Sequence, residues 1–212
     1  ALGKKTGEEN PNLFEELVAG GKGEDIGGII YTSGTTGPPK GAMLSHEGYL
    51  WVGKQASVIT QTQKDDQTIS FLPLNHVYEQ IFDMMVHLTI GHIVNFTENT
   101  DTVTMDMQDV SPTLFHAVPR IWEKYYSSIV LKMDDATWFK KTCFKIALKV
   151  GSEYNSQKLS GKSVPVFLAL AYWAVYFVVF RKLKKRLGFD RVRLGFSGAA
   201  PISHNILKFF QS

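Results

Sequence analysis

The chain has 212 residues, of which 44% are hydrophobic and 20% are charged. That composition supports one sizeable globular core, and the sequence shows no internal repeat or low-complexity tract. The formal charge of +3 gives no indication of a nucleic-acid partner. The single cysteine, Cys143, excludes an internal disulfide framework and is compatible with a reducing compartment. Cys143 lies in an amphipathic stretch, which predicts a core residue and not a nucleophile.

The two ends of the chain resemble the interior of a longer one. The sequence starts without Met, and its first residues, ALGKKTGEEN, contain no apolar signal segment. At the other end, Ser203 is typical of a helix N-cap, and only about two helical turns follow it. We therefore expect a fragment of a larger protein.

Strands are expected to alternate with helices along most of the chain. Residues 1–25 are polar and predict a short helix with connecting loops. Ser45 predicts a helix cap, Gly91 and Gly151 predict helix ends, and Pro119 suits a first helical turn. Strands are predicted at 27–31, 69–74, 92–96, 113–118 and 191–196, and helices at 45–60, 77–90, 119–130 and 138–150. This alternation predicts an α/β fold with a mainly parallel sheet flanked by helices.

Residues 164–180 form a run without charge that contains several aromatic residues. The run is short for a membrane-spanning helix, which needs roughly 20 apolar residues. It leads directly into the cationic segment Arg181–Arg186, which suits a helix lying at an anionic membrane surface. A buried helix that lines a hydrophobic tunnel is the alternative favoured here, and a spanning helix is disfavoured because predicted strands flank it on both sides.

The segment Tyr31–Gly41 (YTSGTTGPPKG) follows a predicted strand and combines hydroxyl side chains, glycines and one lysine. Such a loop offers backbone N–H groups, hydroxyls and an ammonium group to a polyphosphate. Two residues separate Gly37 from Lys40, which differs from the GxxxxGK[ST] phosphate loop and argues against that class of kinase or GTPase.

Three further blocks accompany this segment: Phe71–Glu79 (FLPLNHVYE), Val118–Lys124 (VPRIWEK) and Phe196–Ser203 (FSGAAPIS). Together, in this order, the four blocks resemble the motifs of the adenylate-forming superfamily. The pattern is most similar to long-chain fatty acid–CoA ligases, including the bubblegum type, and covers residues 27–212. The VPRIWEK block is interpreted as mostly structural. The resemblance implies that residues 1–212 are an incomplete AMP-binding (adenylation) domain without its C-terminal lid.

The resemblance also implies a reaction and a set of site residues. The family joins a carboxylate to AMP from ATP and then transfers the acyl group to coenzyme A. Lys40 and Thr35 are the implied catalytic residues, and Thr32 is the implied ligand of Mg²⁺. The implied substrates are a long-chain fatty acid, ATP and CoA. The implied nucleotide-binding residues are Thr32, Ser33, Gly34, Thr35, Thr36, Gly37, Lys40, His76, Gly198, Ala199, Ala200 and Pro201.

Several family elements do not occur in this sequence, among them the Y-G-x-T-E block that would complete the metal site. The isolated chain is therefore expected to be catalytically inactive. Two alternatives remain open: a non-catalytic protein that binds acyl chains or membranes through Val164–Arg186, and a fatty-acyl-AMP ligase. We expect a cytoplasmic protein in peripheral contact with a membrane.

Overall fold

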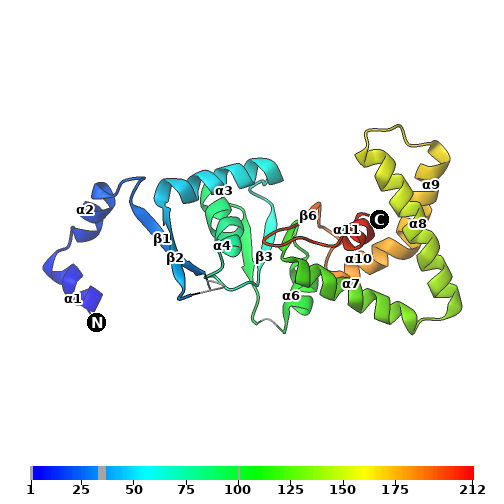
Figure 1. Ribbon diagram of the computed structural model, residues 1–212, viewed down its shortest axis with the longest axis horizontal. Helices are drawn as coiled ribbons and strands as arrows, with labels where there is room; N and C mark the ends of the chain where they lie inside the picture. Colours follow the sequence, from blue (N-terminus) through cyan, green and yellow to red (C-terminus); the bar gives the residue numbers. More distant parts are fainter. Residues whose placement is uncertain (1, 33–36, 100) are drawn as a thin grey trace. The chain divides into compact units, whose positions relative to one another are not determined.

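A computed structural model describes residues 2–32, 37–99 and 101–212. The chain divides into two compact units (Figure 1). The first unit consists of Ala1–Thr62 with Pro73–Gly91, and the second consists of Gln63–Leu72 with His92–Ser212. The chain therefore leaves the first unit, returns to it once and then remains in the second.

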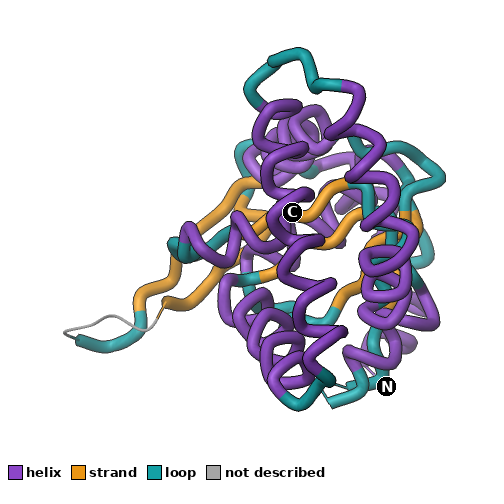
Figure 2. The backbone as a smooth tube through the Cα atoms, turned by 90° about the vertical axis from the view of Figure 1, so that its right-hand side faces the viewer, coloured by secondary structure: helices purple, strands orange, loops and turns teal. Residues whose placement is uncertain are grey.

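The first unit begins with two short helices, α1 (Leu2–Glu9) and α2 (Leu13–Gly20). They are followed by an antiparallel hairpin of strands β1 (Ile26–Thr32) and β2 (Lys40–Ser45), which run side by side in Figure 2. The strand preceding the phosphate-type loop was predicted, but β2 was not. The residues of β2 include a lysine and a glycine in a largely exposed strand, so they give no alternation of apolar and polar side chains.

Helix α3 (His46–Thr60) begins where the sequence predicts it. The Ser45 side chain accepts a hydrogen bond from the backbone N–H of Gly48 at 3.1 Å, which satisfies one of the free donors of the first turn. The helix ends at Gln61, whose backbone is left-handed with φ of 50°. The predicted cap and helix are thus confirmed.

The second long helix of this unit contains a π-helical insertion. It consists of α4 (Val77–Glu79), η1 (Gln80–Met85) and α5 (Val86–Ile90), and it packs against α3. The Tyr49 hydroxyl donates a hydrogen bond to Gln80 Oε1 at 2.7 Å. A Cβ at Gly53 would lie 2.7 Å from Met85 Cβ, so glycine allows this close approach. Gly91 ends the helix as predicted, with φ of 80°.

The second unit contains a parallel strand arrangement. Strand β3 (Gln67–Ser70) pairs with β4 (Ile93–Phe96), and β5 (Leu114–Ala117) pairs with β6 (Leu194–Ser197), both in parallel. The N–H of Thr113 donates to the carbonyl of Gln67 at 2.9 Å, which connects the start of β5 to the start of β3. The predicted α/β class with mainly parallel pairing is confirmed, although the strands are short and most of the chain is helical.

The helices of this unit enclose an aromatic core. They are α6 (Val103–Val110), α7 (Pro119–Asp134), α8 (Trp138–Leu159), α9 (Val166–Val175), η2 (Tyr176–Phe180), α10 (Arg181–Leu187) and α11 (His204–Gln211). Pro119 occupies the first turn of α7, as predicted. Trp122 contacts Phe115 edge to face, with the ring centroids 5.0 Å apart. The VPRIWEK block thus supplies a core anchor. The buried core residues are Ile69, Phe71, Met107, Phe115, Ala117, Trp122, Tyr125, Phe189 and Ile206.

The predicted helix end at Gly151 is wrong. Helix α8 continues through this position to Leu159, and Gly151 is buried within it. A Cβ at Gly151 would lie 2.2 Å from the carbonyl oxygen of Ser212 and 3.0 Å from the Phe180 ring. Glycine is therefore present for close packing between segments distant in sequence, and a local breaker signal cannot separate that role from termination.

Candidate functional site

The β1–β2 hairpin holds the two ends of the segment predicted to bind phosphate. Thr32 and Lys40 are opposite each other in the antiparallel register, and the Thr32 hydroxyl donates to the Lys40 carbonyl oxygen at 3.4 Å. Thr35, together with Ser33, Gly34 and Thr36, lies outside the described residues. The hairpin therefore brings the lysine and threonine at the two ends of the motif together, eight positions apart in the chain.

Close strand packing explains one glycine of the motif. A Cβ at Gly41 would lie 2.7 Å from Ile29 Cγ2 and 3.5 Å from the Tyr31 ring. A larger residue at Gly41, which directly follows Lys40 in β2, would therefore require the Ile29 side chain to move.

The chemistry of the hairpin suits an anion. Lys40, Gly37 and Thr32 are all exposed, and residues 26–45 contain no carboxylate. Among the described residues, no Asp or Glu forms an ion pair with Lys40. The Thr32 hydroxyl can serve as one oxygen ligand of Mg²⁺, which takes most of its remaining ligands from water and phosphate. Among the described residues of the hairpin, Thr32 thus supplies one protein ligand for the metal ion of a nucleotide–metal complex.

His76 lies at the start of α4, where the FLPLNHVYE block leads into the helix. Its Nδ1 accepts a hydrogen bond from the N–H of Tyr78 at 3.2 Å, so His76 is the N-cap of this helix. His76 is an exposed residue. A capping histidine of this kind has its ring held in place and its Nε2 available to a ligand.

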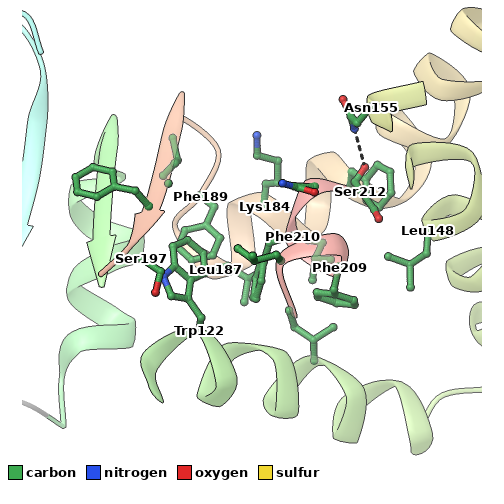
Figure 3. Close-up of a pocket in the computed structure, with 18 of the residues that line it drawn as sticks. Trp122, Leu148, Asn155, Lys184, Leu187, Phe189, Ser197, Phe209, Phe210 and Ser212 are labelled. Carbon is green, nitrogen blue, oxygen red and sulfur yellow. Dashed lines mark hydrogen bonds between the residues drawn. The ribbon is translucent and has the colours of Figure 1, made fainter. Parts of the chain in front are cut away.

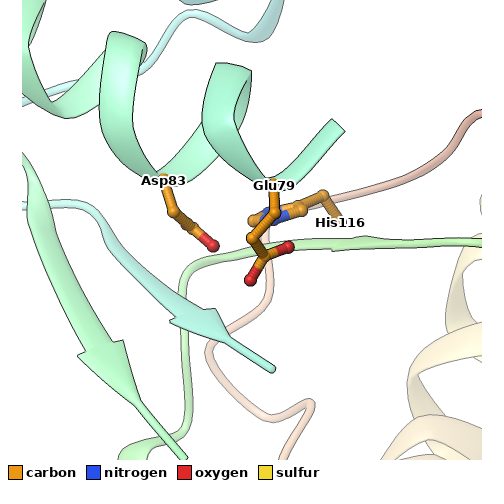
Figure 4. Close-up of side chains that lie close together, drawn as sticks. All are labelled: Glu79, Asp83 and His116. Carbon is orange, nitrogen blue, oxygen red and sulfur yellow. The ribbon is translucent and has the colours of Figure 1, made fainter. Parts of the chain in front are cut away.

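Two buried acidic residues of the same helix were not anticipated. Glu79 and Asp83 lie one turn apart and project from the same side (Figure 4), with 0% and 4% of their surface exposed. Burial, with the negative charges of Glu79 and Asp83, raises the pKa of the neighbouring Tyr78 hydroxyl far above its ordinary value. Side chains four residues apart lie on the same face of a helix, so the spacing of Glu79 and Asp83 is the sequence signal that could have indicated this pair.

The second unit carries the small residues predicted to form a wall against adenine. Gly198, Ala199, Ala200 and Pro201 follow the carboxyl end of β6, and the last three are exposed. In parallel sheets, ligands bind outside this end of the strands. Ala199 has φ of 67°, a left-handed conformation that costs roughly 1–2 kcal/mol for a residue with a Cβ. Strain of this kind gathers at ligand-binding turns.

The strand that leads into this turn is held by an aromatic contact. His116 on β5, which Figure 4 also draws, is 1% exposed and stacks on Phe196 of β6 with ring centroids 5.8 Å apart. A Cβ at Gly195 would lie 2.9 Å from the Trp122 ring. The position of the Gly198–Pro201 turn is therefore set by core packing on both sides of its strand.

An apolar pocket of about 360 Å³ lies among the helices of the second unit (Figure 3). Tyr172, Tyr176 and Phe180 line it from one helix, and Trp122, Phe189 and Phe210 line it from other elements. The inner side of the 164–180 helix lines apolar space, as expected. The prediction that this helix is buried is wrong, because only 11% of the most apolar window of Val166–Leu187 is buried. Burial lowers the pKa of Lys184, which also borders the pocket, against a smaller opposing effect of Asp190.

Comparison with known proteins places this geometry in a family. The sequence model described as "AMP-binding enzyme" matches residues 3–212. The long-chain-fatty-acid–CoA ligase ACSBG2 of Rattus norvegicus is 33% identical over 215 aligned residues, covering 97% of this chain and 32% of that relative. The chain therefore spans about a third of the length of this curated relative.

Two solved structures share the fold. The A-PCP didomain of carboxylic acid reductase from Segniliparus rugosus, in complex with AMP, has a TM-score of 0.54 at 26% identity, over 89% of this chain and 22% of that one. A long-chain-fatty-acid-CoA ligase from Archaeoglobus fulgidus has a TM-score of 0.53 at 18% identity, over 88% of this chain and 27% of that one.

The fold, the threonine- and lysine-flanked hairpin and the small-residue turn thus belong to an adenylate-forming protein. This chain is a member of the AMP-binding enzyme family. Its relatives include long-chain fatty acid–CoA ligases that match nearly all of it.

Proposed function

We propose that this chain is the phosphate- and adenine-binding part of a long-chain fatty acid–CoA ligase. In the proposed reaction, a fatty acid carboxylate attacks the α-phosphate of ATP, forms acyl-AMP and releases pyrophosphate. The thiol of CoA then displaces AMP to give the thioester. The observation that carries the proposal is the hairpin, which sets Thr32 and Lys40 opposite each other at the ends of YTSGTTGPPKG.

Each group has a separate role in this proposal. Lys40 neutralises the β- and γ-phosphates as pyrophosphate leaves, and the Thr32 hydroxyl orients the same oxygens or holds Mg²⁺ beside them. Mg²⁺, when bound, adds further positive charge at the phosphates. The exposed small residues Ala199 and Ala200 provide a flat surface for adenine. His76 borders the nucleotide with its free ring nitrogen.

The test uses the protein as produced from its own gene and measures palmitate-dependent exchange between pyrophosphate and ATP. Lys40→Ala is expected to lower kcat/KM about 10²- to 10³-fold, the usual cost of removing one charge-stabilising group. Lys54→Ala, which removes an exposed lysine of α3 in the same unit, is the matched control and should leave the rate unchanged. A pyrophosphate–ATP exchange rate in Lys40→Ala equal to that of wild type would refute the role of Lys40.

A second assay distinguishes a CoA ligase from a fatty-acyl-AMP ligase. With CoA present, a ligase releases palmitoyl-CoA and AMP in equal amounts. An acyl-AMP ligase gives the same exchange reaction but forms no thioester. Residues 1–212 alone are expected to form no fatty-acid-dependent AMP, because the chain spans about a third of its relatives' length. Measurable AMP formation by this piece would contradict that expectation.

Acyl-chain binding without catalysis is a second candidate, supported by the apolar pocket with Lys184 at its border. An aromatic lining suits an alkyl chain, and the ammonium group suits its carboxylate. Lys184→Met should weaken palmitate binding measured by calorimetry, whereas Lys185→Met, at an exposed neighbouring position, should not. Equal binding by both variants would exclude this pocket.

A further inference from the structure

The helical hairpin of the second unit has one face that the unit leaves uncovered. The hairpin consists of α8 and the continuous helix α9–η2–α10, which lie side by side in Figure 1. The inner face of the second helix is held by Leu168, which is 9% exposed, and by Tyr172, which stacks on Tyr154 of α8. The two tyrosine rings lie 4.0 Å apart and nearly parallel. These contacts fix which side of the helix points outward.

The outward side is apolar and exposed over its first turns. Val166, Leu170, Trp173 and Phe177 follow one another at helical spacing, with 76%, 67%, 50% and 56% of their surfaces exposed. Within the most apolar window of Val166–Leu187, only 11% of residues are buried. We call this line of side chains the outer stripe. An isolated exposed apolar residue is ordinary, but a continuous line of large ones marks an interaction surface.

Cations continue the outer stripe at its carboxyl end. Arg181, Lys182, Lys185 and Arg186 are all exposed on α10. The charge of the surrounding region has the same sign: residues 136–189 contain eleven Lys and Arg and one acid, Glu153. The whole chain has 23 basic and 20 acidic residues, so the remaining residues have 12 basic and 19 acidic. The positive charge of this protein is thus concentrated in the helical hairpin that carries the outer stripe.

A helix that crosses a membrane is incompatible with the strands on either side of it. By length and composition, Val166–Leu187 is long and apolar enough to span. However, β5 precedes it and β6 follows it, and these strands pair in parallel within one sheet. A single crossing would place them on opposite sides of the bilayer. The uncharged part, Val166–Phe180, is also about 22 Å long at 1.5 Å per residue, shorter than the roughly 30 Å hydrocarbon core.

We propose that the outer stripe docks on the surface of an anionic phospholipid membrane, with the helix axis parallel to the bilayer plane. Its apolar and aromatic side chains enter the boundary between headgroups and acyl chains, and the α10 cations contact lipid phosphates. The inner face remains packed against α8. This surface requires neither ATP nor the nucleotide residues, so the inference stands apart from the proposed catalytic function.

The experiment measures co-flotation of the protein, as produced from its own gene, with two kinds of vesicle. One is pure phosphatidylcholine. The other contains about 30% phosphatidylserine, which imitates the anionic lipid of a cytoplasmic leaflet. We expect binding to the anionic vesicles to be at least about tenfold stronger. Salt at about 0.5 M should weaken that binding several-fold, because it screens exposed charges. Equal binding to both vesicles, or no binding to either, would overturn the proposal.

Two variants locate the surface. The double substitution Trp173→Gln and Phe177→Gln removes apolar side chains from the outer stripe and should weaken binding about tenfold. The matched control, Trp51→Gln, removes a similarly exposed tryptophan (62% exposed) from α3 and should bind like wild type. Circular dichroism verifies that each variant is folded. Wild-type binding by the double variant would contradict the assignment.

Two further outcomes would also overturn the proposal. Protection of Trp173 from an aqueous oxidant in the absence of lipid would show that another part of the protein covers the outer stripe. Resistance of the membrane-bound protein to alkaline carbonate extraction would show a spanning helix. Lys40→Ala should bind vesicles like wild type, so loss of catalysis and loss of lipid binding are separable.

Discussion

Asp66 and Arg193 form an ion pair at the amino-terminal edge of the sheet in the second unit. Arg193 Nε donates to Asp66 Oδ1 at 3.0 Å, and its Nη2 contacts the other carboxylate oxygen. Thr113 Oγ1 donates to Asp66 Oδ1 at 2.6 Å, and Gln67 N–H donates to Thr113 Oγ1 at 2.8 Å. Asp66 precedes β3, Thr113 precedes β5 and Arg193 precedes β6, so this network joins the starts of three strands.

The network should stabilise the unit by about 2 kcal/mol. Burial of Asp66 by itself would raise its carboxyl pKa, but hydrogen bonds from Arg193 and Thr113 outweigh this effect and lower the pKa from 3.8 to about 2. The carboxyl pKa therefore differs by nearly two between the unfolded and the folded state, which corresponds to roughly 2.5 kcal/mol of folding stability by linkage. Because the pKa is lower in the folded state, this stability is present above pH 4 and is lost as the pH falls towards 2.

Asp66→Asn tests this magnitude by urea unfolding, monitored by circular dichroism. At pH 7, the variant should lose about 2 kcal/mol relative to wild type. Between pH 4 and pH 2, that difference should shrink towards zero, because wild type becomes protonated at Asp66. Asp65→Asn, at the exposed neighbouring position, should change stability by less than about 0.5 kcal/mol. A difference between Asp66→Asn and wild type that stays constant from pH 7 to pH 2 would refute the reasoning.

Two further predictions concern local backbone features. Ser45→Ala should lower the free energy of unfolding in urea by about 1 kcal/mol, because it removes the hydrogen bond that caps α3. Ser203→Ala should lower it by less, because the Ser203 side chain makes no capping hydrogen bond. Equal losses would argue against the cap. Ala199→Val should cost about 1–2 kcal/mol and Ala199→Gly should cost nothing, since φ is 67° there. A stability loss in the glycine variant would show that the turn is not strained.

The sequence predicted well where short-range interactions decide the outcome. Ser45, Gly91 and Pro119 act on hydrogen bonds and dihedral angles within a few residues of themselves, and each was confirmed. The order of strands and helices was also recovered for most of the chain, because hydrophobic periodicity is itself a local signal. The family resemblance located the hairpin motif through YTSGTTGPPKG, and the family model confirmed the membership.

Site prediction from the sequence was less complete. The sequence placed Thr32 and Lys40 on one loop, but in the structure Thr32 ends β1 and Lys40 starts β2 opposite it. Strand pairing depends on partners across a turn, and β2 has no alternating pattern of its own. The buried pair Glu79 and Asp83 was missed for a related reason: burial of a charged side chain is decided by neighbours distant in sequence.

The sequence by itself determined the family, the α/β alternation and the helix caps, since each depends on residues adjacent in the chain. The tertiary structure decided that Gly151 lies inside a helix, that Asp66 meets Arg193 across 127 positions, and that one helix has a buried and an exposed apolar face. Val166–Phe180 is apolar all round, so its composition alone could not distinguish those two faces. Packing of Tyr172 on Tyr154 made the distinction, because only a contact between distant segments fixes the rotation of a uniformly apolar helix.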